Sequence, residues 1–361
     1  MTYFLLILSI FVWPFGQLLT FSFLGQSFNY YLLDLVLGLL TLSLFLSAKN
    51  RRLITSDPLF KPLVVFLFAA SLSLLFNFKY VLSGGLIYPL FYLLRLFIYP
   101  SLYFAVKLYS GPNLSKAIVF SLVLFSLLGL AQYLFLPDMR YLKLIGFDDH
   151  YYRLIGSLYD PNFTGAIFAG VALVLIATGQ LLLSLFFVGL LALTFSRASF
   201  LCFGAGLLYL LFKKRQKKIL FFLFILSLLI WLTPKPFGEG VNLLRTFSIF
   251  SRLGSWQGGL TLFSERPILG WGYNTLRNII GSRFQIDNSY LYLAATTGII
   301  GLSAFIYLLY KSWSVLSSLP ARLFFLTILI HSLFNNSLFF IWISFAYWLA
   351  LGLGTKAYKK E

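Results

Sequence analysis

The chain has 361 residues, of which 60% are hydrophobic and only 11% are charged, and a mean hydropathy of +0.89 excludes the soluble globular classes. A net charge of +18 would suggest nucleic-acid binding in a soluble protein, but lysine-rich loops on the inner side of a membrane explain it without nucleic acid. The single cysteine, Cys202, excludes an intrachain disulfide, and two histidines with scattered acidic residues predict neither a metal site nor a cofactor.

Apolar runs recur along the chain at about the 20-residue length that crosses a bilayer. We therefore predict an all-α, polytopic membrane helical bundle with about twelve transmembrane helices, forming one integral membrane domain over residues 1–361. No basic stretch precedes the first run, so we expect it to remain as a span. The predicted spans are 3–24, 30–48, 60–78, 84–107, 116–136, 161–178, 180–195, 198–212, 219–233, 288–310, 320–337 and 339–355.

The basic residues predict the topology. If the N-terminus lies inside, every Lys-rich stretch also falls inside, as the positive-inside rule requires, and both termini are cytoplasmic. The inner side then carries 12 Lys and 4 Arg, whereas the outer side carries 3 Lys and 8 Arg. Because the planar arginine fork binds phosphate oxygens in pairs, the outer face is expected to bind a phosphorylated ligand.

Several charged residues in the first 200 positions admit two interpretations. Asp34 and Arg95 fall inside predicted spans, where they could pair for structure or line a pathway. The first long outer segment, 137–160, contains His150, expected in a solvated loop, and leads into Asp160-Pro161-Asn162, which indicates a turn and helix start before a ligand contact. Arg197, at the outer end of a short span, is either a phosphate clamp or a snorkelling boundary residue.

The second outer segment, residues 234–287, is the longest stretch outside the predicted spans. Its apolar residues are spaced as on one helix face, at Leu243, Phe247, Phe250, Leu253, Trp256, Leu260 and Phe263. Arg245, Arg252 and Arg266 fall on another face. We predict an amphipathic helix along the outer membrane boundary with its apolar side down, ended or bent by Pro267. The segment carries five Arg and one Lys but only three acidic residues. Because positive charge usually collects on the inner side of a membrane, this outer excess suggests a function.

Two further polar positions follow this segment. Asp287 lies at the mouth of a span, where its carboxylate could act as general base on a sugar hydroxyl. The alternative is helix capping, which favours Asp or Asn before an apolar run. His331, with Asn335 and Asn336, forms a polar face within a span, and hydrogen bonding between helices is the expected role.

Several stretches resemble the O-antigen polymerase and O-antigen ligase superfamily. They are Arg252-x-x-x-Trp256, Arg266-Pro267-Ile268-Leu269-Gly270-Trp271-Gly272, Asp287-Asn288-Ser289-Tyr290-Leu291 and Thr297-Gly298-Ile299-Ile300-Gly301-Leu302, with Asp160-Pro161-Asn162 and Thr194-Phe195-Ser196-Arg197 upstream. The likeness covers most of residues 150–340 and is most specific over 252–302. It implies a C-type glycosyltransferase-like fold with an external, periplasmic helical loop over 234–287.

The resemblance also implies an activity and a place. Members of the superfamily are metal- and cofactor-independent enzymes of the bacterial inner membrane, with the active site facing the periplasm, that move a glycan en bloc from undecaprenyl diphosphate to a sugar hydroxyl. By position, Asp287 would activate the acceptor, and Arg197 and Arg252 would bind the diphosphate. Other candidate diphosphate ligands are Arg153, Arg266 and Arg277. The candidate residues lining the acceptor are Tyr290, Asn288, Trp256, Tyr273 and Asn162.

The residue at 287 separates the branches of the superfamily. Ligases usually carry His where this chain has Asp287, whereas Asp is frequent among polymerases. We therefore predict a repeat-unit polymerase that transfers the growing chain to a second lipid-linked unit. The alternatives are an O-antigen ligase with lipid A core as acceptor and, from another class, a transporter or flippase for lipid-linked glycan, whose charges should gather near the bilayer midplane. A structural subunit of a biosynthetic complex is a third possibility.

Overall fold

The computed structural model describes all residues except 23–28, 84–87, 215–220, 234–238, 282–283 and 359–361. The first helices are α1 (Thr2–Val12), α2 (Leu32–Leu46), α3 (Ala48–Thr55), α4 (Phe60–Phe76), α5 (Lys79–Ser83), α6 (Tyr88–Ile98), α7 (Ser101–Tyr109) and α8 (Pro112–Phe135). The later helices are α9 (Pro161–Thr178), α10 (Leu181–Leu193), α11 (Arg197–Lys214), α12 (Phe221–Leu232), α13 (Phe247–Glu265), α14 (Leu276–Ile279), α15 (Ser289–Val315), α16 (Leu319–His331) and α17 (Ile341–Gly354).

The remaining regular elements are short. Strands β1 (Thr20–Ser22) and β2 (Asn29–Tyr31) pair antiparallel, and 3-10 turns occur at η1 (Trp13–Leu18), η2 (Arg140–Ile145), η3 (Gly156–Leu158) and η5 (Glu239–Val241). This architecture confirms the predicted all-α membrane bundle. A cluster of buried apolar side chains extends from α1 to α17, but the assignment of residues 1–361 to one domain stays a prediction.

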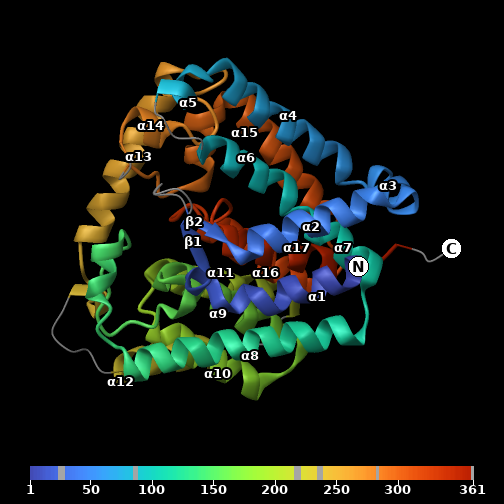
Figure 1. The fold of residues 1–361 in the computed structure, drawn as a ribbon. Helices are drawn as coiled ribbons and strands as arrows, with labels where there is room; N and C mark the ends of the chain where they lie inside the picture. The colour runs from blue at the N-terminus through green and yellow to red at the C-terminus, as the bar shows by residue number, and fades with distance from the viewer. Residues whose placement is uncertain (23–28, 84–87, 215–220, 234–238, 282–283, 359–361) are drawn as a thin grey trace.

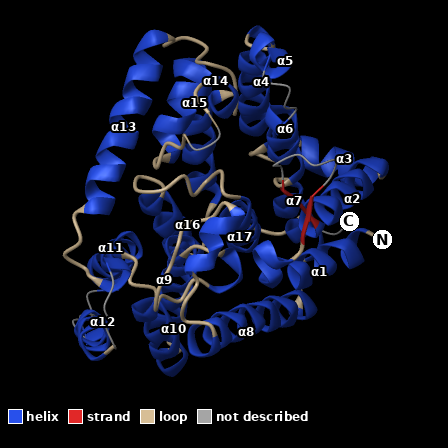
Figure 2. Cartoon of the chain, turned by 60° about the vertical axis from the view of Figure 1, so that its left-hand side comes forward, coloured by secondary structure: helices blue, strands red, loops and turns tan. Residues whose placement is uncertain are grey.

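The bundle has two ends that differ in what they contain. Both termini lie at one end together with α3, at the right of Figure 1, and we call it the terminal end. At the opposite end, α13 crosses the bundle from the side of α4 and α5 toward α11 and α12 (Figures 1 and 2). We call this the α13 end.

Each of the twelve predicted spans contains a helix. By length and composition, four segments of the described residues can cross a membrane, or five if α2 and α3, bent by 97°, form one span. Six shorter apolar helices accompany them. Some predicted runs are interrupted by the backbone; the described part of the run 3–24, for example, is divided among α1, η1 and β1. The number of about twelve spans stays a prediction.

α15 is broken at Gly298, and the segment after α13 fills the break. Gly298 has φ +63°, and a Cβ there would lie 2.1 Å from the carbonyl oxygen of Ile268. The amides of Trp271 and Gly272 donate to Ala295 and Thr296, and the amide of Ile299 donates to Pro267. The backbone groups released by the break therefore find partners in the glycine-tryptophan-glycine segment, which explains why the two motifs occur together.

The two charges expected inside spans pair with each other. The Arg95 guanidinium donates from Nε and Nη2 to the two carboxylate oxygens of Asp34, at 3.0 and 2.6 Å, and the Tyr99 hydroxyl donates to the same carboxylate at 2.9 Å. A bidentate pair with an added donor satisfies the charges of both groups. The structural alternative for this pair is therefore confirmed.

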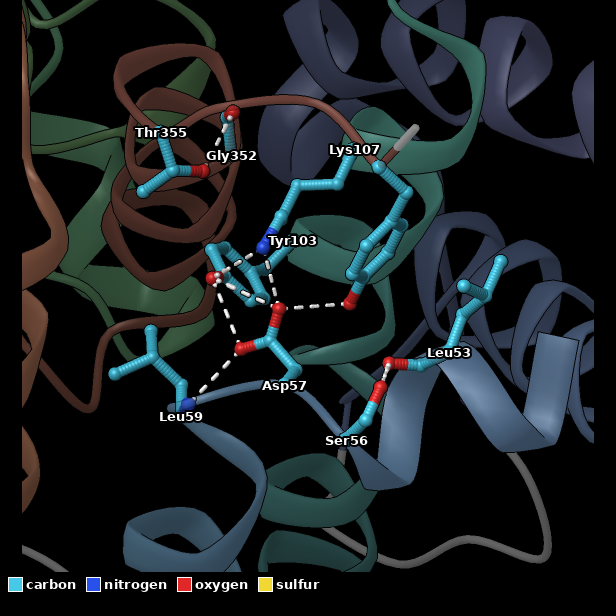
Figure 3. A network of polar contacts seen from close by, with 9 residues as sticks. Leu53, Ser56, Asp57, Leu59, Tyr103, Lys107, Gly352 and Thr355 are labelled. Carbon is cyan, nitrogen blue, oxygen red and sulfur yellow. Dashed lines mark hydrogen bonds and ion pairs between the residues drawn. The ribbon is translucent and has the colours of Figure 1, made fainter. Parts of the chain in front are cut away.

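A second buried ion pair lies at the end of α7. The ammonium of Lys107 pairs with Asp57, whose side chain is 0% exposed (Figure 3). The hydroxyls of Tyr103 and Tyr358 and the amide of Leu59 also donate to Asp57. The C-terminal tail thus covers this pair.

Candidate functional site

α13 carries the candidate site along its inner side. The helix ends at Glu265, immediately before Arg266-Pro267, as proline predicts. Its apolar side chains lie on the outer surface, with Phe247, Phe250 and Leu253 exposed by 73%, 67% and 52%. The opposite side of α13 packs against the rest of the protein. It carries Ser248, Arg252, Ser255 and Trp256, which are spaced four, three and one residues apart. Phe247, Phe250 and Leu253 lie away from Arg252 as predicted, but Trp256, expected on the apolar face, lies on the side of Arg252. The placement of α13 on a membrane boundary stays a prediction.

Arg197, at the start of α11, is held against the N-terminal part of α13. Its Nη1 donates to the carbonyls of Leu243 and Arg245 at 3.1 and 2.8 Å, and its Nη2 donates to the Ser248 hydroxyl at 2.6 Å. These contacts fix the guanidinium against protein groups, so it does not snorkel as an isolated boundary residue.

Arg252 lies one helical turn beyond Ser248. Its Nε donates to the carbonyl of Phe334 at 2.9 Å, and its Nη2 contacts Asn335 Oδ1 at 3.4 Å. Burial lowers the pKa of Arg252, and the carboxylate of Asp287 opposes that shift. The charges of Arg197 and Asp160 also act on this guanidinium, so charged groups from three separate stretches of the chain influence it.

Asp287 is attached to α13 through its backbone. Its amide donates to the Ser255 hydroxyl at 2.8 Å, and its carbonyl accepts from the Trp256 indole at 3.1 Å. Asn288, not Asp287, caps α15, because the Asn288 Oδ1 accepts from the amides of Tyr290 and Leu291. The capping interpretation of Asp287 is therefore wrong.

The carboxylate of Asp287 is left available for chemistry. In the part of the chain that the structure describes, it makes no hydrogen bond or ion pair, although Arg252 is close enough to act on its charge. Burial raises the pKa of Asp287 and Arg252 lowers it in turn. A half-buried carboxylate with a raised pKa, near enough to an arginine to interact with its charge, suits proton abstraction.

Arg153 and Asp160 complete the charged cluster. Arg153 donates to the carbonyls of Thr194 and Phe195, and burial, aided by the charge of Arg245, lowers its pKa to about 9. Asp160 caps α9 through the amides of Asn162 and Phe163, which confirms the predicted helix start, and burial raises its pKa to about 6. These carbonyl contacts anchor Arg153 to the turn that precedes Arg197.

His150 and Asn162 both lie close to the charged cluster in the sequence, and both are enclosed by protein groups. His150, expected in a solvated loop, is only 7% exposed, and burial together with the charge of Arg153 lowers its pKa to about 3. Asn162 accepts from the Ser196 hydroxyl through Oδ1 and from the Ser199 hydroxyl through its carbonyl, both at 3.0 Å. The two upstream motifs of the chain are thereby joined directly.

Five of the predicted site residues lie elsewhere or are already engaged. Arg266 follows the far end of α13 and bonds to Asn77 and Tyr80, while Arg277 lies on α14, which packs on α5. Tyr273 is buried against Tyr292 and Phe339, and the Tyr290 hydroxyl donates to the carbonyl of Leu329. The side chain of Asn288 also donates to the carbonyl of Leu333. The predicted cluster of outer arginines is thus divided between the two ends of α13; Arg283 lies outside the described residues.

Sequence reasoning did not foresee the polar chain behind Arg252. Asn335, which contacts Arg252, lies 3.3 Å from His331 Nε2, and His331 Nδ1 lies 2.6 Å from the Ser337 hydroxyl. His331 was expected to bond between helices. Its side-chain partners Ser337 and Asn335 lie in the loop after its own helix, and the backbone of Asn162 on α9 also interacts with it. The proximity of two asparagines to this histidine was visible in the sequence, whereas the approach of α13 was not.

Residues 181–306 match the model of the family described as O-antigen ligase. The matched range contains Arg197, Arg252, Asp287 and the break at Gly298. No curated protein matches the chain. Residues 181–306 are therefore similar to the family described as O-antigen ligase, and this range is about a third of the chain.

Proposed function

We propose that this protein is a polysaccharide repeat-unit polymerase of the bacterial inner membrane. Its donor is a glycan carried on undecaprenyl diphosphate, and its acceptor is a sugar hydroxyl of a second lipid-linked unit. The observation that carries the proposal is the arrangement on α13, where Ser248 holds Arg197, the helix itself supplies Arg252, and Ser255 and Trp256 hold Asp287. The α13 end would then face the periplasm.

The transfer needs one proton acceptor and a site for departing charge. Asp287 takes the proton of the attacking hydroxyl, whose oxygen forms a bond to the anomeric carbon as the bond from that carbon to the diphosphate oxygen breaks. Undecaprenyl diphosphate leaves with the electron pair. Arg197 and Arg252, already oriented by protein contacts, stabilise the negative charge that develops on it.

Polymerase activity is favoured over ligase activity by the residue at 287. The family description names a ligase, and the ligase alternative requires lipid A core as acceptor. The carboxylate of Asp287 can act as the base in place of a histidine. The side chain of His331 is already hydrogen-bonded to Ser337 and Asn335. The transporter alternative expects its charges near the bilayer midplane, whereas Arg197, Arg252 and Asp287 gather at the α13 end.

The test is elongation of purified lipid-linked units by the full-length protein in detergent or liposomes. Replacing Asp287 with Asn should slow elongation about 100- to 10,000-fold, the usual worth of a positioned base. The control is Asp138→Asn, which removes an exposed carboxylate that is already paired with Arg140.

The outcomes separate the candidate functions. Undiminished elongation by Asp287→Asn removes Asp287 as the base. Consumption of lipid A core in place of a lipid-linked unit identifies a ligase. Movement of unaltered substrate across liposomes without bond cleavage identifies a transporter.

A further inference from the structure

A polymerase that joins two lipid-linked units must hold two lipids at different distances from the reacting atoms. The donor diphosphate is the leaving group, so it lies beside the base. The acceptor reacts at the sugar farthest from its own lipid, so its diphosphate lies one repeat unit away. The second site must therefore combine a cation with a lipid-facing groove, displaced from Asp287 along the outer end of the protein.

Arg266 supplies a cation in such a position. Its Nη1 donates to Asn77 Oδ1 and its Nη2 to the Tyr80 hydroxyl, both at 2.8 Å, and the guanidinium lies 4.0 Å from the centre of the Trp271 ring. No ion pair forms at Arg266 within the described ranges, so its charge is not cancelled by a carboxylate. The side chain borders a cavity of about 330 Å³ with Phe76, Asn77 and residues 267–270.

An apolar groove of about 510 Å³ lies between α4 and α15. Phe68 and Leu72 line one wall, and Ile300, Ser303 and Tyr307 line the other. Phe68, Ile300 and Tyr307 are 65%, 41% and 38% exposed, so the groove opens on the outer surface of the bundle. Helices α4 and α15 lie side by side here (Figure 1).

The groove and the Arg266 cavity are lined by neighbouring segments of the backbone. The amide of Ile299, in the groove, donates to the carbonyl of Pro267, in the cavity, at 2.7 Å. On α4, Leu72 of the groove lies one turn before Phe76 of the cavity. The Arg266 cavity and the groove are therefore neighbours, so a single lipid could place its phosphate at Arg266 and its chain between the two helices.

We propose that Arg266 and the α4–α15 groove form a second binding site for a polyprenyl diphosphate, which holds the acceptor lipid. Trp256, which holds Asp287, and Arg266 are separated by ten residues along α13, or about 15 Å at 1.5 Å per residue. This separation leaves space for a short oligosaccharide between the acceptor diphosphate and the base. The assignment rests on the proposed polymerase function and adds where its second substrate binds.

Photolabelling of the purified full-length protein tests binding without relying on activity. The probe is a polyprenyl diphosphate with a photoreactive group at the end of its chain, and labelled peptides are mapped by mass spectrometry. We expect labelling of α4 and α15, reduced about tenfold or more by Ser303→Trp, which fills the groove from an exposed position. Ile306→Trp is the matched control, because Ile306 is 47% exposed on α15 but outside the groove.

Two results would overturn the lipid site. One is labelling of α4 and α15 that Ser303→Trp leaves unchanged. The other is displacement of the probe by phosphatidylglycerol as effectively as by unlabelled undecaprenyl diphosphate, which would identify a general lipid contact.

A kinetic comparison separates this site from the proposed function. Ser303→Trp and Arg266→Gln should raise the KM for a lipid-linked acceptor about tenfold and leave transfer to a lipid-free acceptor oligosaccharide unchanged. If wild-type protein elongates both acceptors and Ser303→Trp does so equally well, the second site is wrong while the polymerase stands. If wild-type protein elongates neither, the polymerase itself is wrong.

Discussion

Replacing Arg252 tests whether this side chain stabilises the departing diphosphate. A guanidinium has five N–H donors. Arg252 uses Nε–H for the carbonyl of Phe334 and one Nη2–H for Asn335, which leaves both Nη1 hydrogens and one on Nη2 for a ligand. These remaining donors form a fork of the kind that binds two phosphate oxygens at once.

The magnitude follows from the loss of that fork. Removing one preorganised donor to a developing negative charge typically slows catalysis about 100- to 1,000-fold. Arg252→Gln should therefore lower kcat for elongation by about this factor. Arg252→Lys keeps the charge but loses the paired donors, so its defect should be smaller, and the order wild type, Lys, Gln is the expected signature.

The assay is elongation of purified lipid-linked units, with binding of undecaprenyl diphosphate measured in parallel. Arg140→Gln is the control, because Arg140 is an outer arginine whose side chain is 62% exposed and pairs with Asp138. Equal activity of Arg252→Gln and wild type would refute the assignment. A defect as large in Arg140→Gln would show that the effect reflects total charge and not the position of Arg252.

Three further predictions concern acidity and stability. Because burial raises the pKa of Asp287 and Arg252 lowers it, kcat/KM should fall on the acid side through a pKa above the ordinary value of about 3.9, and Arg252→Gln should move this limb to higher pH. Gly298→Ala should destabilise the protein in thermal unfolding by about 1–3 kcal/mol, because the new Cβ would meet a backbone oxygen. Lys107→Met should cost about 3–5 kcal/mol in the same assay by leaving Asp57 buried without its cation, and a double variant with Asp57→Asn should recover part of it.

The sequence predicted which elements form better than where they end. Apolar runs identified the helices of the bundle because burial in lipid leaves a compositional signal over many residues. They did not predict the interruption of the first run after Val12, or the break at Gly298, because both depend on backbone partners distant in the chain. Pro267, by contrast, predicted the end of α13 because proline acts locally.

In the candidate site, too, local features were predicted and contacts between distant residues were not. Asp160 was identified as a helix start from three consecutive residues, and its cap is present. Arg266 was grouped with Arg252, yet the two have different protein partners, because periodicity gives the face of a helix and not the neighbours along its length. α13 carries the two arginines toward different partners, Phe334 and Asn77.

The partners of the clustered arginines explain why this end of the bundle suits an anion. Arg153 and Arg245 bond to the carbonyl of Phe195, Arg197 bonds to that of Leu243, and Arg252 bonds to that of Phe334. Carbonyls orient a guanidinium without neutralising it, whereas a carboxylate would cancel its charge. Burial, and after it the charge of Arg245, lowers the pKa of Arg153, so part of this shift reflects repulsion between like charges. A bound diphosphate would offset the repulsion between these guanidinium groups. The clustered positive charges, which lower the stability of the fold, therefore raise its affinity for an anion.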